Sequence, residues 1–190
     1  MKNLVVLFLL FSTFTLVAQE STSNAKSKWI IGFGANFIDN TATKNGKYIN
    51  ASDQWNYIST VSKVSLEKIV SDQFSIEGSL GINQLSKNVP QNGTSINEDQ
   101  NYVGFDLNGK FYLGKEFIKC PAFDPYIVAG FGLNKVGDNS NQSSNFGVGF
   151  NMWFNPSLGL RLQTLGKYGF TQNTLLNNHI QHSAELVFKF

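Results

Sequence analysis

The chain has 190 residues, a formal net charge of +2, 42% hydrophobic residues and only 15% charged residues. This length suits one ordinary domain, and the apolar composition argues against intrinsic disorder. The nearly balanced charges, without a basic stripe, exclude the electrostatic footprint of a nucleic-acid-binding protein. The single cysteine, Cys120, excludes an intramolecular disulfide and a multi-cysteine metal site.

Residues 1–18 have the organisation of a secretory signal peptide. A positively charged start precedes a mostly apolar run from Leu4 to Val17, and Ala18 supplies a small residue before the expected cleavage site. The run is shorter than the approximately 20 residues that a membrane-spanning helix needs. We therefore expect cleavage after residue 18 and export of residues 19–190 as one domain. A retained N-terminal anchor is the alternative.

The exported part contains eight segments in which apolar and polar residues alternate, as expected for half-buried β-strands. They span residues 29–38, 57–67, 74–83, 102–113, 126–134, 145–154, 158–164 and 179–190.

The connections between these segments differ in length. Those at 39–56, 84–101, 135–144 and 165–178 are long and polar, those at 68–73 and 155–157 are short, and 114–125 is intermediate. Long loops at one end and short turns at the other are typical of outer-membrane barrels. The pattern predicts an all-β protein, an eight-stranded antiparallel up-and-down transmembrane β-barrel. Its long loops are expected to be extracellular and its short turns periplasmic.

The polar face of the segments carries equal numbers of acids and bases. In an eight-stranded membrane barrel this face lines a narrow interior, where buried charges must pair. We therefore predict a lumen ionic cluster that closes the interior; a solvated outer face of a soluble barrel is the alternative. The predicted cluster consists of Lys63, Glu67, Glu77, Asp106, Lys110, Arg161, Glu185 and Lys189.

Aromatic residues occupy two further places that suit a membrane barrel. The last segment carries Phe188 and Phe190, and this ending resembles the signal that barrel insertion machinery recognises. Other aromatic residues near segment ends are predicted to lie in the girdles at the two membrane interfaces. These are Trp29, Tyr57, Tyr102, Tyr112, Tyr126 and Trp153.

Four stretches of the chain resemble the OmpA-like family of eight-stranded outer-membrane barrels. They are FSIEGSLG at 74–81, GFDLNGK at 104–110, DPYIVAG at 124–130 and NPSLGLR at 155–161. The resemblance implies an interior ionic cluster in which Glu77, Lys110 and Arg161 match three members by position. The fourth position, normally an acid, is Asn151 here, and Glu67 or Glu185 could substitute for it. We expect the barrel alone, without the family's peptidoglycan-binding domain.

The expected role is structural or interactive, with surface-exposed loops. One alternative is an accessory subunit of a larger outer-membrane complex, for which outward glycines Gly78 and Gly109 would allow close approach. Others are a barrel enzyme, such as a lipid A-modifying hydrolase, or a small pore. We expect no catalytic site, because His182 and Ser183 are strand neighbours that point to opposite faces. We expect no cofactor or metal either, since His179 and His182 are poorly spaced for coordination.

The expected partners follow from the predicted location in the outer membrane. They are the lipid bilayer with its lipopolysaccharide, the barrel insertion machinery during biogenesis and, in the alternative above, a larger outer-membrane complex. No nucleic acid is expected.

Overall fold

The computed structural model describes residues 29–40, 55–113, 120, 122–171, 175 and 177–190. The predicted signal peptide and the beginning of the exported domain lie outside these residues. None of the described residues belongs to a helix that is long and apolar enough to span a bilayer.

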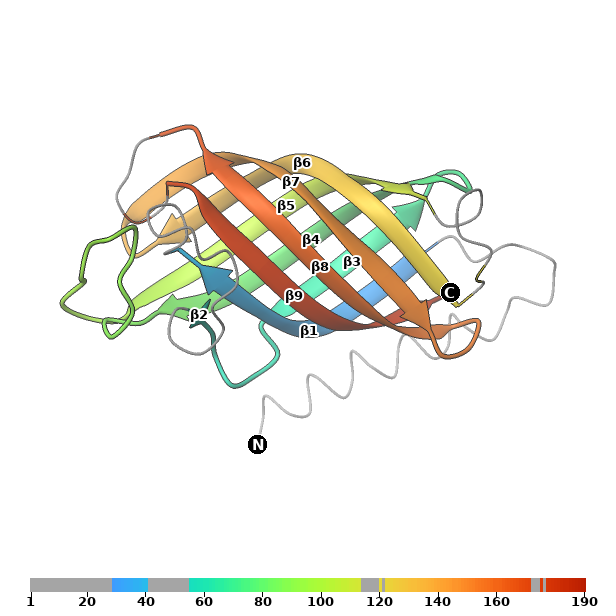
Figure 1. Ribbon diagram of the computed structural model, residues 1–190, viewed down its shortest axis with the longest axis horizontal. Coiled ribbons are helices and arrows are strands. Elements are labelled where there is room, and N and C mark those ends of the chain that lie inside the picture. The colour runs from blue at the N-terminus through green and yellow to red at the C-terminus, as the bar shows by residue number, and fades with distance from the viewer. Residues whose placement is uncertain (1–28, 41–54, 114–119, 121, 172–174, 176) are drawn as a thin grey trace, which may run out of the picture.

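The described residues form a closed antiparallel barrel of eight long strands (Figure 1). Consecutive long strands pair with one another, and β1 pairs with β9 from Ile30–Lys189 to Asp39–Ile180, which closes the barrel. The two-residue β2 extends the wall beside the end of β1. The strands are β1 (Trp29–Asp39), β2 (Trp55–Asn56), β3 (Lys63–Ile69), β4 (Phe74–Leu85), β5 (Gln100–Tyr112), β6 (Phe123–Val136), β7 (Asn139–Trp153), β8 (Leu158–Gly169) and β9 (His179–Lys189).

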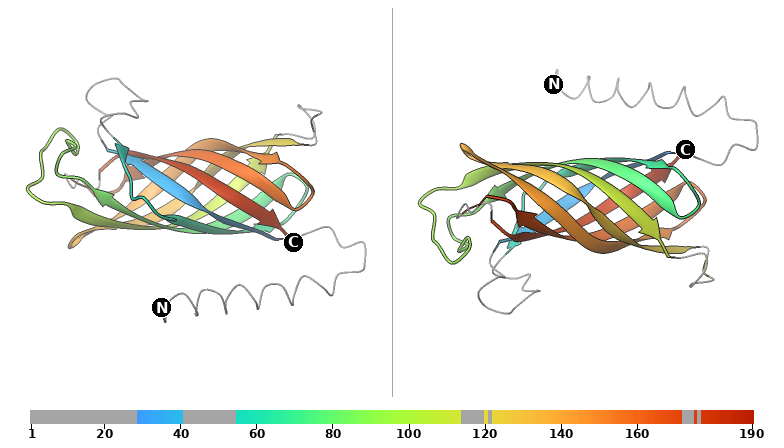
Figure 2. Two further views of the ribbon diagram at one scale, coloured as in Figure 1. Left: turned by 90° about the horizontal axis from the view of Figure 1, so that it is seen from below. Right: turned by 90° about the horizontal axis from the view of Figure 1, so that it is seen from above.

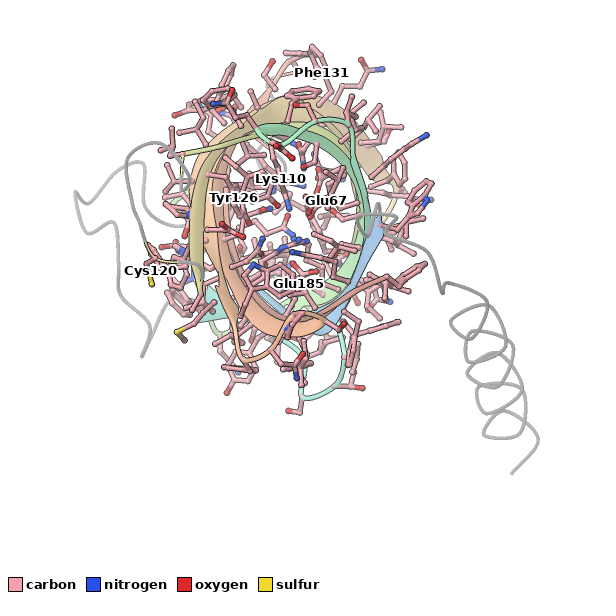
Figure 3. The ribbon with its side chains drawn as sticks, turned by 90° about the vertical axis from the view of Figure 1, so that its right-hand side faces the viewer. Glu67, Lys110, Cys120, Tyr126, Phe131 and Glu185 are labelled. Carbon is pink, nitrogen blue, oxygen red and sulfur yellow. The ribbon has the colours of Figure 1, made fainter. Side chains whose placement is uncertain are left out.

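Polar side chains fill the interior and apolar side chains cover the outside, which is the predicted assignment of the two faces. Figure 3 shows Glu67, Lys110, Tyr126 and Glu185 inside the wall and Phe131 pointing away from it. This arrangement is the reverse of a soluble barrel and matches a wall that faces lipid. Exposed apolar residues on the strands include Val64, Leu66, Ile76, Leu80, Ile82, Val103, Phe105, Leu107, Phe111, Ile127, Leu133, Phe146, Val148, Met152, Leu162, Leu186 and Phe188.

The two ends of the barrel differ, and we call them the turn end and the loop end (Figure 2). The turn end carries the connections between β3 and β4, β5 and β6, and β7 and β8. Trp29 and Phe190 also meet there, where the two residues exchange backbone N–H···O bonds of 3.0 and 2.9 Å. The loop end carries β2 and the connections between β1 and β3, β4 and β5, β6 and β7, and β8 and β9.

Several predicted boundaries are wrong at the loop end. Residues 135–144 are not a long loop: β6 and β7 continue through them to a two-residue turn at Gly137-Asp138, where Gly137 has a φ of 54°. Polar residues occupy both faces of these strand ends, which removed the alternation used for the prediction. β8 likewise continues to Gly169, five residues beyond its predicted end. β3 is shorter than predicted and begins only at Lys63.

The aromatic residues near the strand ends are only partly as predicted. Trp29 and Tyr57 expose their rings on the outside, but Tyr102 and Tyr126 are buried in the interior. The Tyr112 hydroxyl also turns inward, to Glu67. Strand parity explains the difference, because each of these tyrosines shares a face with the polar residues of its strand.

Candidate functional site: the charged interior

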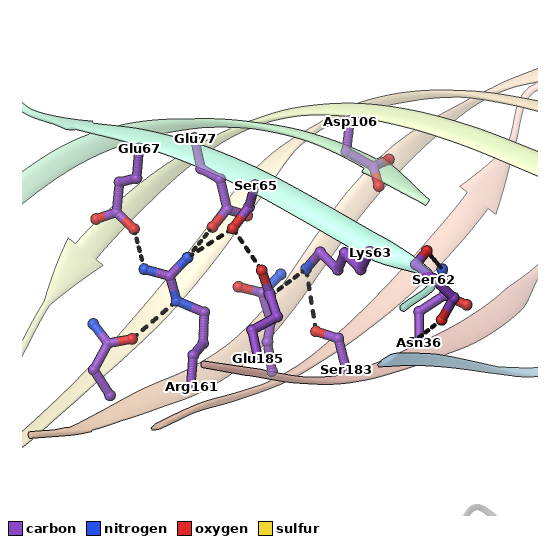
Figure 4. Close-up of polar contacts among 12 residues, drawn as sticks. Asn36, Ser62, Lys63, Ser65, Glu67, Glu77, Asp106, Arg161, Ser183 and Glu185 are labelled. Atoms are coloured by element: carbon purple, nitrogen blue, oxygen red, sulfur yellow. Dashed lines mark hydrogen bonds and ion pairs between the residues drawn. The ribbon is translucent and has the colours of Figure 1, made fainter. Parts of the chain in front are cut away.

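Arg161 of β8 lies at the centre of the buried charges (Figure 4). Its Nη2 lies 2.5 Å from Glu67 Oε2 on β3, and its Nη1 lies 2.6 Å from Glu77 Oε2 on β4. Its Nε donates to Asn151 Oδ1 at 2.9 Å. One guanidinium therefore bridges two carboxylates and an amide in a fixed geometry, which is the arrangement that arginine favours.

Lys110 of β5 completes this group. Its Nζ lies 3.0 Å from Glu67 Oε2 and also contacts Glu77 Oε2. The Tyr112 hydroxyl donates to Glu67 Oε1 at 2.6 Å. Two cations thus share two acids, and all four charged side chains are completely buried.

Lys63 and Glu185 form a neighbouring pair, 2.9 Å apart. Ser65 donates to Glu185 Oε2 at 2.5 Å, and Lys63 Nζ donates to Ser183 Oγ at 3.1 Å. Asn151 occupies the position where the family resemblance implies an acid, and its amide accepts from Arg161 instead. Glu67 supplies a second carboxylate for Arg161, as the sequence analysis allowed.

Asp106 pairs with a cation that the sequence analysis missed. Lys167 Nζ lies 2.7 Å from Asp106 Oδ1 and donates to Asn134 Oδ1 at 2.9 Å. The Tyr102 hydroxyl donates to the same Asn134 oxygen at 2.6 Å. Lys167 falls beyond the predicted end of its strand, although it continues the spacing of every second residue that begins at Arg161. The ion pairs of the described interior therefore join four cations to four acids.

The remaining predicted residues lie near the turn end. Lys189 is half-buried, and its Nζ lies 3.9 Å from the ring centroid of Trp153. Phe188 and Phe190 are exposed on the outside of the wall. Their position is accessible to another protein, and their role as an insertion signal stays a prediction.

Connections from the loop end cover the interior above these charges. Ile38, Leu85, Tyr102 and Val136 form a small buried apolar cluster against which Ile96 and Leu175 pack. The side chain of Gln91 is also buried, and its Nε2 donates to Asn56 Oδ1 at 3.1 Å. We call these residues the loop-end cap; the sequence analysis did not anticipate it.

The two histidines point to opposite sides of the wall. His182 lies on the outside, where its Nδ1 is 2.9 Å from Thr164 Oγ1, whereas Ser183 points inward to Lys63. His179 is buried inside, 3.4 Å from the Tyr102 hydroxyl. The expected separation of His182 and Ser183 is therefore confirmed. Within the described residues, no three His, Cys, Asp or Glu side chains are grouped to hold a metal ion.

Gly78 and Gly109 lie on the outside, as predicted. A Cβ added at Gly78 would have no heavy atom within 4 Å, whereas at Gly109 it would meet the ring of Phe74 at 3.3 Å. Gly78 therefore leaves open space on the wall.

Known structures share this architecture. Neisserial surface protein A superposes with a TM-score of 0.55 at 14% identity, covering 87% of this chain and 98% of that chain. The N-terminal β-barrel domain of Pseudomonas aeruginosa OprF gives 0.52 at 15% identity, covering 85% and 97%. Pseudomonas aeruginosa OprG gives 0.52 at 12%, covering 86% and 93%. At these identities the likeness shows the fold alone, and no curated protein matches the chain.

The sequence itself identifies the family. Residues 6–190 match the profile of the family described as outer membrane protein beta-barrel domain. The match spans every strand of the barrel, and it agrees with the apolar outer wall and the polar interior. The chain therefore belongs to the outer membrane protein β-barrel family, and its eight-stranded barrel is integral to the outer membrane.

Proposed function

We propose that this protein is a closed-lumen barrel with a structural or interaction role rather than a conducting pore. The observation that carries the proposal is Arg161, whose guanidinium reaches from β8 to Glu67 and Glu77 on β3 and β4. An eight-stranded barrel has an interior only wide enough for side chains. Ion pairs that cross it leave little room for a continuous water column, and the loop-end cap adds a second obstruction.

Conductance in planar lipid bilayers tests the closed lumen. The purified barrel should insert and show no stable open level, while a general porin in the same bilayer conducts. Persistent ohmic conductance of the wild-type barrel would overturn the proposal and favour the small pore.

The proposed orientation places the loop end outside the cell and the turn end in the periplasm. The longer connections at the loop end support it. Cys120 offers a native probe because its side chain is exposed at the turn end. A membrane-impermeant maleimide should label Cys120 only after the outer membrane is permeabilised. Asn88→Cys in a Cys120→Ser background should instead be labelled on intact cells; the opposite pattern would reverse the orientation.

The proposed partners are the bilayer with its lipopolysaccharide and, during biogenesis, an insertion machinery that binds the strand carrying Phe188 and Phe190. A larger outer-membrane complex is the second candidate, because Gly78 leaves open space on the outer wall. Extraction of a loop-tagged barrel in mild detergent distinguishes the two roles. A single species supports the autonomous barrel, and a stoichiometric complex makes it an accessory subunit.

We expect no catalytic activity, because His182 and Ser183 lie on opposite faces of the wall. Comparison of lipid A and protein profiles between wild type and His182→Ala tests this expectation. A change that depends on His182 would favour the enzyme.

A further inference from the structure

A groove with a volume of about 600 Å³ lies on the outside of the wall near the loop end. It crosses β5, β6 and the beginning of β7. The chain after β8 borders it, where Phe170 N–H donates to the Gln142 carbonyl at 2.9 Å. This backbone bond holds Phe170 beside the wall, while the residue stays 60% exposed.

The groove is apolar in one part and polar in the other. Phe105 pairs with Leu133, and Leu133 pairs with Gln142, in one row across the strands. One step closer to the loop end, Lys135 pairs with Val103 and Ser140. The edge of the apolar outer surface therefore passes between Leu133 and Lys135.

Lys135 is the charged group of this groove. Its side chain is exposed, and none of the described residues that line the groove is acidic. Ser140, Gln142 and Thr171 lie around it and offer hydroxyl and amide groups. A single cation surrounded by neutral polar groups, directly above an apolar floor, matches an amphiphile with a phosphate and sugar hydroxyls at its head.

We infer that this groove binds one molecule of a phosphorylated glycolipid from the outer leaflet. The phosphate lies against Lys135, the sugar hydroxyls against Ser140 and Gln142, and an acyl chain along Phe105, Leu133 and Phe170. The inference rests on the proposed orientation, because only then does the loop end face the leaflet that contains lipopolysaccharide. The neutral polar groups favour a glycolipid over a glycerophospholipid, which offers fewer hydroxyls.

Retention of lipid A in phosphatidylcholine nanodiscs tests the inference. Barrels reconstituted with a small fraction of lipid A are re-extracted in mild detergent, and the bound lipid is quantified by native mass spectrometry. Lys135→Gln should retain roughly tenfold less lipid A, because one charge-assisted hydrogen bond is lost. Lys68→Gln is the matched control, since Lys68 is an exposed cation on the outside at the turn end. It should retain lipid A like the wild type.

A second measurement changes the lipid instead of the protein. Dephosphorylated lipid A should lose retention on the wild-type barrel to a similar extent, with no further loss on Lys135→Gln. Equal retention by wild type and Lys135→Gln, or equal loss in Lys68→Gln, would overturn the inference. Retention of phosphatidylglycerol as strong as that of lipid A would overturn the choice of a glycolipid.

Failure of this inference is distinguishable from failure of the proposed function. Maleimide labelling of Cys120 in intact cells reports the orientation, and bilayer conductance reports the closed lumen. Neither measurement depends on Lys135.

Discussion

Lys167 on β8 and Asp106 on β5 form an ion pair across the barrel, with 2.7 Å between Nζ and Oδ1. Their strands are not neighbours, because β6 and β7 lie between them in the wall. Arg161 on the same strand reaches Glu67 on β3, on the other side of β9 and β1. β8 is thus tied through the interior to strands on both sides of the barrel.

The Lys167–Asp106 pair should behave as a coupled unit. Asp106→Asn alone leaves a buried ammonium without its acid, and we expect a loss of about 3–5 kcal/mol in the free energy of unfolding. The double variant Asp106→Asn/Lys167→Met should lose clearly less than the sum of the two single variants. Urea unfolding of the refolded barrel in lipid vesicles measures the free energy of unfolding of the wild type, Asp106→Asn, Lys167→Met and the double variant. Strict additivity would show that the pair contributes no coupling.

Loss of Arg161 should affect both stability and closure. Arg161→Ala leaves Glu67 and Glu77 with Lys110 as their only ion-pair partner among the described residues. We expect a loss of about 3–5 kcal/mol in unfolding free energy and measurable conductance in planar bilayers. Arg161→Lys retains the charge without the planar fork and should lie between wild type and alanine. Wild-type stability together with wild-type conductance in Arg161→Ala would contradict the ionic closure.

A side chain at position 149 should destabilise the barrel. A Cβ at this position would lie 2.5 Å from the Tyr126 hydroxyl oxygen and 2.7 Å from the Leu162 carbonyl oxygen. Gly149→Ala must therefore displace Tyr126 from Gln163, to which its hydroxyl donates at 2.8 Å. We expect a loss of about 1–3 kcal/mol by urea unfolding. Gly78→Ala is the control, because open space surrounds its added methyl; an equal loss in both variants would refute the steric explanation.

Asn83 should control local opening of the wall near the loop end. β3 begins at Lys63, so beyond that point asparagine side chains connect β1 to β4. Asn83 Nδ2 lies within hydrogen-bond distance of three acceptors: the Asn36 carbonyl at 3.1 Å, Asn36 Oδ1 at 2.5 Å and the Asn56 carbonyl at 3.1 Å.

Asn83→Ala should speed amide hydrogen exchange in the loop-end half of β1, because the carbonyl and the side chain of Asn36 lose their hydrogen bonds to Asn83. Exchange in the β6–β7 hairpin provides the internal reference and should not change. Unchanged exchange at Asn36–Ile38, measured by mass spectrometry, would contradict this role of Asn83. It would show that other contacts stabilise β1 beyond its last pair with β3, Gly34–Lys63.

Sequence patterns located the strands well where one face is apolar and the other polar. The segments around Glu77, Lys110 and Arg161 were predicted with their correct faces, because period-two alternation is a local property of the chain. The same rule failed at the loop ends of β6, β7 and β8. In β6 and β7 the outward residues, such as Lys135 and Gln142, are polar as well, so the alternation disappears although the strands continue. In β8 the pattern is interrupted differently, because the inward Leu165 is apolar and buried and the outward Gly166 has no side chain. Lys167 was missed for this second reason.

The sequence by itself determined the architecture of this protein: eight alternating strands, an apolar outer wall and an interior that carries both signs of charge. Only the tertiary structure decided which charges meet. Arg161 and Glu67 are distant in the chain, and strand tilt and register decide which inward side chains reach the same depth in the barrel. The loop-end cap and the groove beside Lys135 likewise depend on how separate connections fold back onto the wall. Local alternation carries no information about such contacts, because it specifies the face of a residue but not its partner across the lumen.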